Sequence, residues 1–219
     1  MPARPPLAPI ELVYQDEHLL VLNKPPGLLS VPGRGEDKQD CLSRRAQHHF
    51  PDALIVHRLD MATSGLLLMA RSPAMQRLLG AQFEARTVDK QYVAVVDGCL
   101  LESTGTWQLI DLPIAVDWPR RPLRIIDAAL GKPSQTRWQV MAVDARAGTT
   151  RVALAPVTGR SHQLRVHMQA MGHPILGDAL YASEAVQAKA GRLLLHAQAL
   201  AFDHPATKKR LAFSSEPPF

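Results

Sequence analysis

Residues 56–70 read VHRLDMATSGLLLMA, and three of them, His57, Arg58 and Asp60, stand between two apolar stretches typical of buried strands. A carboxylate at the end of a strand, beside a guanidinium, can be kept ionised and directed into a cleft. The same aspartate could instead cap backbone amides in a turn. Spacing alone favours the turn, which is the more common use of such a residue.

Local signals on the N-terminal side of this segment predict a hairpin, a loop and a short helix. Residues 12–23 hold two β-rich pieces around a polar turn, which is the pattern of a hairpin. Clusters of Pro and Gly between residues 24 and 35 predict loops. Residues 41–50 predict a short helix, and residues 54–56 a buried strand that leads into the polar segment.

On the C-terminal side, the run at residues 66–70 predicts a second buried strand, and Ser72-Pro73 predicts a helix start with Ser as N-cap and Pro at the first helical position. This helix should end near Arg86. Its apolar face is expected to consist of Met75, Leu78, Leu79 and Phe83.

The second half of the chain is mainly strand-like. Strands are predicted in QYVAVVDG, TWQLIDLPI, SQTRWQVMAV and TTRVALAPV, starting at residue 91. A helix carries Leu164, His167, Met168 and Met171 on one face, and a last short helix runs from Ser183 to before Gly191. The predicted fold class is therefore α+β, a single domain at residues 11–219 with a mixed, mostly antiparallel sheet, after an extended proline-rich arm at residues 1–10.

A second segment with several candidate functional side chains is TGRSHQLRVHMQAMGHPILGD, residues 158–178. His162 and His167 are five residues apart, so they diverge on a helix and point to opposite faces on a strand. This spacing, with no HExxH motif, argues against a zinc site. Arg160 and Arg165 more readily meet phosphates or a carboxylate.

Two further segments are candidates for contact with nucleic acid. Tyr92, in a strand, usually packs in a core, but a tyrosine can also stack on a base. Arg120, Arg121 and Arg124 lie beside Trp118; such a group is most often a solvated loop, and in a nucleic-acid enzyme it would contact phosphates. The formal net charge of +5 is compatible with a polyanionic partner but is too modest to identify one.

Several classes of protein are not supported by the sequence. It has no GxSxG elbow, no complete phosphate-binding P-loop and no dinucleotide-binding glycine pattern, so neither a nucleotide cofactor nor a metal is expected. The two cysteines, Cys41 and Cys99, suggest reduced thiols in a cytoplasmic protein. The apolar runs are too short to span a bilayer, and a monomer is the default expectation.

Taken together, these segments resemble the RluA family of pseudouridine synthases, over roughly residues 10–219, and its short members most of all. HRLD followed by TSG, with TGRxHQLRVH downstream, is a specific combination. It moves the interpretation of Asp60 from turn residue to catalytic residue. The matching pieces occur in the family's order: NKPPGLLSVPGR (23–34), HRLDMATSGLLLMA (57–70), KQYVAVVDG (90–98), TGRSHQLRVHMQAMGHPILGD (158–178) and LLLHAQAL (193–200).

The resemblance implies an enzyme that needs no cofactor and acts on stem-loops of 23S rRNA, tRNA or both. It implies that Asp60 is the catalytic aspartate and that Arg165 pairs with it. Arg58 would take part in flipping out the target nucleotide, and Tyr92 would pack against the uracil. Leu194 or, as we expect, Leu195 would supply the apolar wall of the pocket.

His57, Arg160, Arg120 and Arg121 are further RNA-contact candidates. Many relatives carry an N-terminal S4 RNA-binding domain, which is not expected here because only about ten residues precede the catalytic region. Two mild departures are Ala182 after Tyr181, where many relatives have Gly, and Ser161 after Arg160, where many have Thr.

Two other functions fit the sequence less well. A non-catalytic RNA-binding module that keeps the fold would be expected to lack the aspartate, but Asp60 is present. A base- or nucleoside-processing hydrolase would need a second carboxylate in the pocket, and Asp178 is the only nearby candidate. Its setting, HPILGD, fits a turn better.

Overall fold

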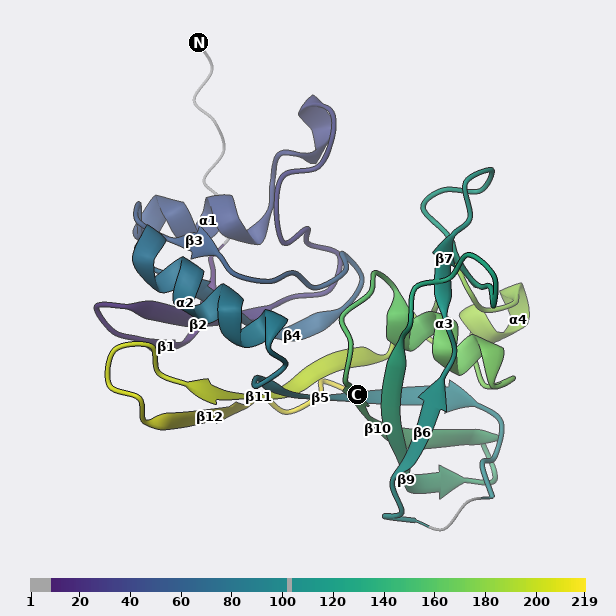
Figure 1. Cartoon of the computed structure of the whole chain (residues 1–219). Helices are drawn as coiled ribbons and strands as arrows, with labels where there is room; N and C mark the ends of the chain where they lie inside the picture. The colour runs from purple at the N-terminus through teal and green to yellow at the C-terminus, as the bar shows by residue number, and fades with distance from the viewer. Residues whose placement is uncertain (1–8, 102–103) are drawn as a thin grey trace. The chain divides into compact units, whose positions relative to one another are not determined.

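The computed structural model describes residues 9–101 and 104–219. Most of the predicted N-terminal arm therefore lies outside the described residues. The internal contacts of the chain divide it into two compact units, Met1–Val88 with Ala201–Ser215, and Asp89–Leu200 with Glu216–Phe219. Figure 1 shows the elements of both along the chain.

The first unit is built around two strands with no polar face. The strands β2 and β4 pair antiparallel from Leu19↔Ala70 to Lys24↔Gly65, and every side chain of β4 is buried. Burial on both faces explains why these strands are continuous apolar runs rather than alternating ones. The elements of this unit are β1 (Glu11–Gln15), β2 (Leu19–Lys24), η1 (Glu36–Lys38), α1 (Leu42–His49), β3 (Leu54–Ile55), β4 (Ser64–Ala70), α2 (Pro73–Glu84) and β12 (Arg210–Ser214).

Several local predictions for this unit are confirmed. The hairpin is β1 paired with β2, and α1 falls inside the predicted 41–50. Helix α2 begins after Ser72, whose hydroxyl accepts the N–H of Met75 at 3.3 Å, with Pro73 at its first position. The predicted apolar face of α2 is too wide, because Leu78 is exposed and Leu79 is buried.

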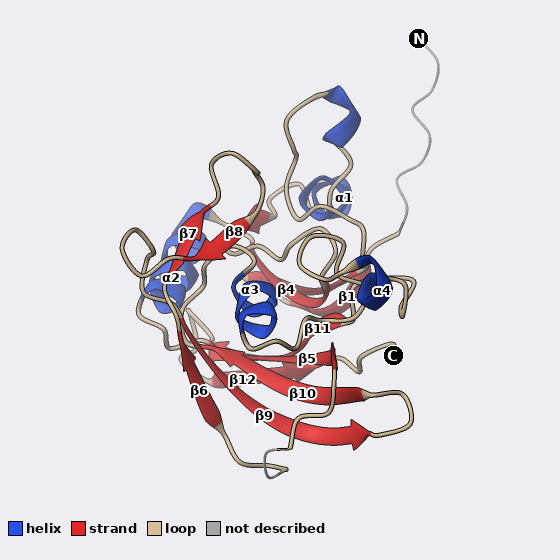
Figure 2. Cartoon of the chain, turned by 90° about the vertical axis from the view of Figure 1, so that its right-hand side faces the viewer, coloured by secondary structure: helices blue, strands red, loops and turns tan. Residues whose placement is uncertain are grey.

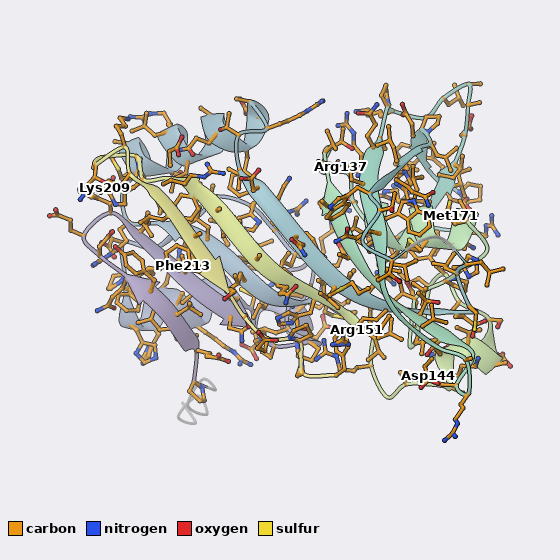
Figure 3. The ribbon with its side chains drawn as sticks, turned by 90° about the horizontal axis from the view of Figure 1, so that it is seen from below. Arg137, Asp144, Arg151, Met171, Lys209 and Phe213 are labelled. Carbon is orange, nitrogen blue, oxygen red and sulfur yellow. The ribbon has the colours of Figure 1, made fainter. Side chains whose placement is uncertain are left out.

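Strand β12 was not predicted. It pairs with the C-terminal part of β11, whose residues Ala201–Asp203 belong to this unit. Phe213, labelled on β12 in Figure 3, places its ring 5.1 Å from that of Tyr14 and 6.0 Å from that of Phe202. The contact between Tyr14 and Phe213 joins strands that are nearly 200 residues apart, so no local pattern in the sequence predicts it.

The second unit is a mainly antiparallel sheet with helix α3 packed on it. Its strands are ordered β11-β5-β10-β9-β6, with antiparallel pairing of β5 with β10, β10 with β9, and β9 with β6. The elements are β5 (Asp89–Asp97), β6 (Gln108–Asp111), β7 (Ile114–Val116), β8 (Arg124–Ile126), β9 (Gln135–Asp144), β10 (Thr149–Pro156), α3 (Gln163–Ala170), α4 (Glu184–Gln187) and β11 (Leu195–Asp203).

Helix α3 packs against β8, β9 and β10, and the separate hairpin β7–β8 lies beside it in Figure 2. Buried Ile114, Val166 and Tyr181 join this hairpin to the helix. The predicted class, α+β with a mixed and mostly antiparallel sheet, is confirmed by these elements.

Candidate active site

The segment that carries Asp60 is irregular but held in place. Residues 56–63 connect β3 to β4 without regular structure, and the N–H of Thr63 donates to the carbonyl of Asp60 at 3.1 Å. The side chain of Asp60 is half-buried, while the neighbouring Leu59 is buried. The predicted buried strand at residues 54–56 is shorter and less buried than expected: β3 is only Leu54–Ile55 and is half-buried, and Asp60 lies in the irregular segment between β3 and β4.

The backbone on both sides of Asp60 is anchored by the loop that follows β2. The hydroxyl of Ser30 donates to the carbonyl of Leu59 at 2.7 Å and accepts its N–H at 3.1 Å. The N–H of Gly27 donates to the carbonyl of Met61 at 2.9 Å. Residues 59 and 61 are thereby fixed, so the position of the aspartate between them is set by hydrogen bonds rather than by the turn alone.

Lys24 is the residue in this site that sequence reasoning missed. Its side chain is 0% exposed, and its ammonium donates to the carbonyls of Pro25, Leu28 and Met61 at 2.9, 2.7 and 3.0 Å. A buried ammonium is costly unless its donors are satisfied, and three carbonyls satisfy them. The available signal was a lysine that closes the apolar run LLVLN directly before two prolines.

His57 is held by the sheet. The N–H of Leu68 in β4 donates to Nε2 of His57 at 3.0 Å, and the imidazole stacks on Phe83 with centroids 4.5 Å apart. Nε2 accepts, so a neutral ring carries its proton on Nδ1. The imidazole therefore continues the hydrogen-bond ladder of β4 beyond β3, which gives His57 a structural use besides any contact with RNA.

Arg58 lies between two anchored neighbours and is itself exposed. Its guanidinium makes no hydrogen bond or ion pair with any residue in the ranges that the structure describes. A long cation held at its base and open at its tip can enter an RNA without first breaking a protein contact.

In the second unit, Arg165 forms a buried ion pair with Asp178. Its Nε and Nη2 donate to the two carboxylate oxygens at 2.7 and 2.5 Å, and both side chains are buried. The carboxylate also accepts the N–H groups of Leu180 and Tyr181 at 2.9 and 3.1 Å. A bidentate pair with these extra donors fixes the guanidinium plane.

Asp178 is therefore not the second catalytic acid that a hydrolase would need. The carboxylate is fully buried and occupied by four donors. Gly177 precedes it with φ +71°, and a Cβ there would lie 1.9 Å from the carbonyl oxygen of Arg192. The turn predicted from HPILGD is thus real, and its aspartate serves to orient Arg165.

Three further candidates of the second unit lie on two strands and in one loop. Tyr92 is half-buried on β5, opposite Leu154 of β10. Leu195 begins β11 and is buried, whereas Leu194 is half-buried. Arg160 is exposed in the loop before α3, where its N–H donates to the Gln163 side chain at 3.0 Å.

Buried polar groups hold α3 against β9. Gln163 donates to the hydroxyl of Thr136 at 3.0 Å, Thr136 contacts Nδ1 of His167 at 2.9 Å, and Nε2 of His167 contacts the carbonyl of Leu112 at 3.0 Å. Because a carbonyl only accepts, Nε2 carries a proton, and burial of the ring favours its neutral form, in which Nδ1 accepts from the Thr136 hydroxyl. Burial lowers the pKa of His167 below its ordinary value, although the hydrogen bond to Leu112 opposes this shift.

This lowered pKa predicts a loss of stability in mild acid. Below about pH 6.5, His167 is protonated in the unfolded chain but not in the folded one. The free energy of unfolding therefore falls by up to about 1.4 kcal/mol for each pH unit of acidification, until the pH reaches the pKa of the folded state. Urea unfolding at pH 7.0 and 5.5 should therefore show a smaller decline for His167→Gln than for the unchanged protein. An equal decline in both would contradict the assignment of a neutral imidazole.

The described residues contain no group of three or more His, Cys, Asp or Glu side chains that could hold a metal ion. His162 illustrates why: its Nδ1 lies 2.7 Å from the hydroxyl of Tyr181, while His167 is used inside the fold. Nor does any helix in the described ranges have the length and apolar character needed to cross a membrane.

Comparison with known proteins decides the family. Residues 18–170 match the model of the RNA pseudouridylate synthase family, which is more than half of the chain. The chain belongs to this family. Curated relatives named "Dual-specificity RNA pseudouridine synthase RluA" are similar over nearly their whole length: that of Yersinia pestis is 50% identical over 95% of this chain and 99% of its own, and that of Escherichia coli K12 is 50% identical over 98% and 97%.

Two solved structures of human pseudouridylate synthase domain proteins support the same family assignment. Human RNA Pseudouridylate Synthase Domain Containing 1 is 29% identical, with a TM-score of 0.80 over 99% of this chain and 86% of its own. Human RNA Pseudouridylate Synthase Domain Containing 4 is 26% identical, with a TM-score of 0.72 over 95% and 88%. The resemblance to the RluA family found in the sequence is confirmed, and so is the identity of this chain as an isomerase that acts on RNA.

The candidate residues of this synthase divide between its two units. His57, Arg58 and Asp60 share one anchored segment of the first unit. The second unit holds the others: Tyr92, Arg120, Arg121, Arg160, Arg165 and Leu195.

Proposed function

We propose that this synthase converts specific uridines in stem-loops of 23S rRNA, tRNA or both into pseudouridine, with Asp60 as its nucleophile. Relatives at about 50% identity are named dual-specificity RNA pseudouridine synthases, which supports more than one RNA substrate. The observation that carries the proposal is the Asp60 segment: a half-buried aspartate, fixed through residues 59 and 61, two positions after an exposed arginine.

The reaction explains why one carboxylate can suffice. The C1′–N1 bond breaks, the uracil turns, C1′ joins C5, the C5 proton leaves and N1 gains a proton. No electrons are gained or lost, so no redox cofactor is required. Asp60 can act at uracil C6, at ribose C1′, or on the C2′ proton, and all three need an ionised carboxylate held still against the nucleotide.

Base flipping follows from the position of the target. A uridine stacked in a folded loop cannot reach a half-buried carboxylate, so it must be extruded at a cost of a few kcal/mol. Arg58 is suited to fill the space that the uridine leaves, because its backbone neighbours are anchored and its guanidinium is exposed. Contacts to phosphates by Arg160, Arg120 and Arg121 would offset part of the cost.

Three residues of the second unit complete the proposed pocket. Tyr92 would pack against the uracil and Leu195 would close the apolar wall. Arg165 would pair with Asp60 and keep it ionised. Asp178 accepts hydrogen bonds from Nε and Nη2 of Arg165, which fixes the plane of the guanidinium.

This function places the protein in the cytoplasm with its RNA substrates, and we propose that it acts as a monomer. Cys41 and Cys99 are both free thiols, in keeping with a reducing compartment.

We expect a short stem-loop to be a good substrate, because specific RNA recognition usually targets the shape and the unpaired bases of a loop. A synthetic anticodon-type stem-loop of about 17 nucleotides should be modified with a kcat/KM within about a hundredfold of that of full-length RNA. Tritium release from C5-labelled uridine measures both. A larger deficit, above about 2.7 kcal/mol of transition-state binding, would show that distant RNA contacts are required.

We also expect full turnover in EDTA with no added nucleotide, because the proposed chemistry uses only side chains and the described residues form no metal-binding group. The measurement is tritium release after dialysis against chelator, with the melting curve of the RNA recorded alongside. Turnover that disappears while the RNA stays folded, and that returns with zinc or magnesium, would refute this.

A further inference from the structure

The tip of the β7–β8 hairpin is a closed loop with a defined shape. The N–H of Asp117 donates to the carbonyl of Leu123 at 3.1 Å, and the N–H of Leu123 donates to the carbonyl of Arg120 at 3.0 Å. The Asp117 carboxylate, on a residue that is 5% exposed, accepts the N–H and Nε of Arg120 at 3.3 and 2.7 Å. At its base, the N–H of Arg124 donates to the buried Tyr181 hydroxyl at 2.9 Å.

This loop displays a tryptophan to solvent. Trp118 is 64% exposed, whereas the other two tryptophans are buried or half-buried. The guanidinium carbon of Arg121 lies 3.8 Å from the centroid of the Trp118 ring, and Nε of Arg121 points to the Trp118 carbonyl at 3.4 Å. The guanidinium thus covers one face of the indole and holds the ring in place, while much of the indole surface stays exposed to solvent.

The two arginines of the loop differ in how far their charge is compensated by a carboxylate. Arg120 is paired with Asp117 at 2.7 Å, so its charge is largely compensated within the loop. Arg121 contacts an aromatic ring and a carbonyl, and no carboxylate pairs with it among the residues that the structure describes. Of the two, Arg121 therefore carries the charge that is available to a phosphate.

We propose that Trp118 and Arg121 form a stacking platform for an unpaired nucleobase of the RNA substrate. The base stacks on the open face of the indole, and the guanidinium of Arg121 contacts the adjacent phosphate. Aromatic rings bind bases this way in single-stranded RNA, and every base offers a π-face, so the platform selects looped over paired RNA. A flat ring backed by a cation fits this ligand better than it fits an apolar partner, because the platform is surrounded by charge.

The proposal rests on the proposed function and adds that the β7–β8 hairpin distinguishes unpaired from paired RNA. The role of Arg120 changes accordingly: it shapes the loop through Asp117 rather than gripping the backbone, which Arg121 does.

The test compares the affinity of platform variants for the same stem-loop of about 17 nucleotides. Trp118→Ala should raise Kd about 5- to 150-fold, which corresponds to about 1–3 kcal/mol for one stacked base. Trp118→Phe should recover most of the affinity. The control is Leu130→Ala, an apolar side chain 81% exposed after β8, which should bind like the unchanged protein. Equal melting temperatures would show that the variants are folded.

Fluorescence gives a readout that a structural role would not move. Binding of the stem-loop should quench the tryptophan emission of the unchanged protein, and Trp118→Phe should abolish most of this quenching. A fully paired duplex of the same length should not quench. For the phosphate contact, Arg121→Gln should reduce the dependence of log Kd on log salt by about one counterion, whereas Arg146→Gln, at the exposed β9–β10 turn, should not.

The failures are distinguishable. If the unchanged protein makes no pseudouridine, the proposed function fails whatever the platform does. If it makes pseudouridine while Trp118→Ala binds the stem-loop as tightly as Leu130→Ala does, or while the duplex quenches as strongly as the loop, the platform is refuted.

Discussion

Replacement of Asp60 by Asn is expected to reduce pseudouridine formation by at least about a thousandfold, or about 4 kcal/mol of transition-state stabilisation. Asn keeps the shape of the side chain but has neither its charge nor its nucleophilicity. Because residues 59 and 61 are anchored through their backbones, the segment should keep its conformation in the variant. RNA binding should therefore stay nearly unchanged.

Tritium release from C5-labelled uridine measures the loss, and filter retention measures binding. Asp52→Asn is a matched control in the same unit, since this carboxylate forms only an exposed pair with Arg71 at 3.1 Å and should change neither quantity. Residual activity of Asp60→Asn above a few per cent would remove Asp60 as the nucleophile.

The second large effect concerns stability. Asp178→Asn should lower the free energy of unfolding by about 3–5 kcal/mol, because it breaks a bidentate ion pair between two buried side chains. Asp97→Asn breaks a more exposed pair with Lys189 and should cost about 0–1 kcal/mol. Urea unfolding at pH 7 measures both variants.

A double variant separates the pair from its surroundings. Arg165→Met with Asp178→Leu removes both charges and should recover much of the stability that Asp178→Asn loses, though not the activity. If Asp178→Asn costs no more than Asp97→Asn, the pair does not stabilise the fold in the way its burial implies.

The parts of the fold that were predictable depend on neighbours in the chain. Ser72 before Pro73 is a complete helix start in two residues, and the structure has it. The run at residues 66–70 is apolar on both faces, and β4 is indeed buried on both. Strand β12 was missed in part because one of its aromatic partners, Tyr14, lies near the other end of the chain.

The candidate site shows the same division. HRLD between two strands could be located from pattern and resemblance, and the segment lies where it was predicted. Its support by Lys24 and Ser30 could not, because hydrogen bonds to the carbonyls of Met61 and Leu59 depend on how the two loops meet. Asp178 was expected to be a turn residue, and only the structure shows that its carboxylate also binds Arg165.

The most direct test of the account is the product of the purified protein. The full chain is incubated with a C5-tritiated stem-loop, and both the released tritium and the nucleosides of the digested RNA are measured. The account predicts one pseudouridine for each tritium released, no free uracil, and neither product with Asp60→Asn. Free uracil without pseudouridine, or pseudouridine formed equally well by Asp60→Asn, would contradict it.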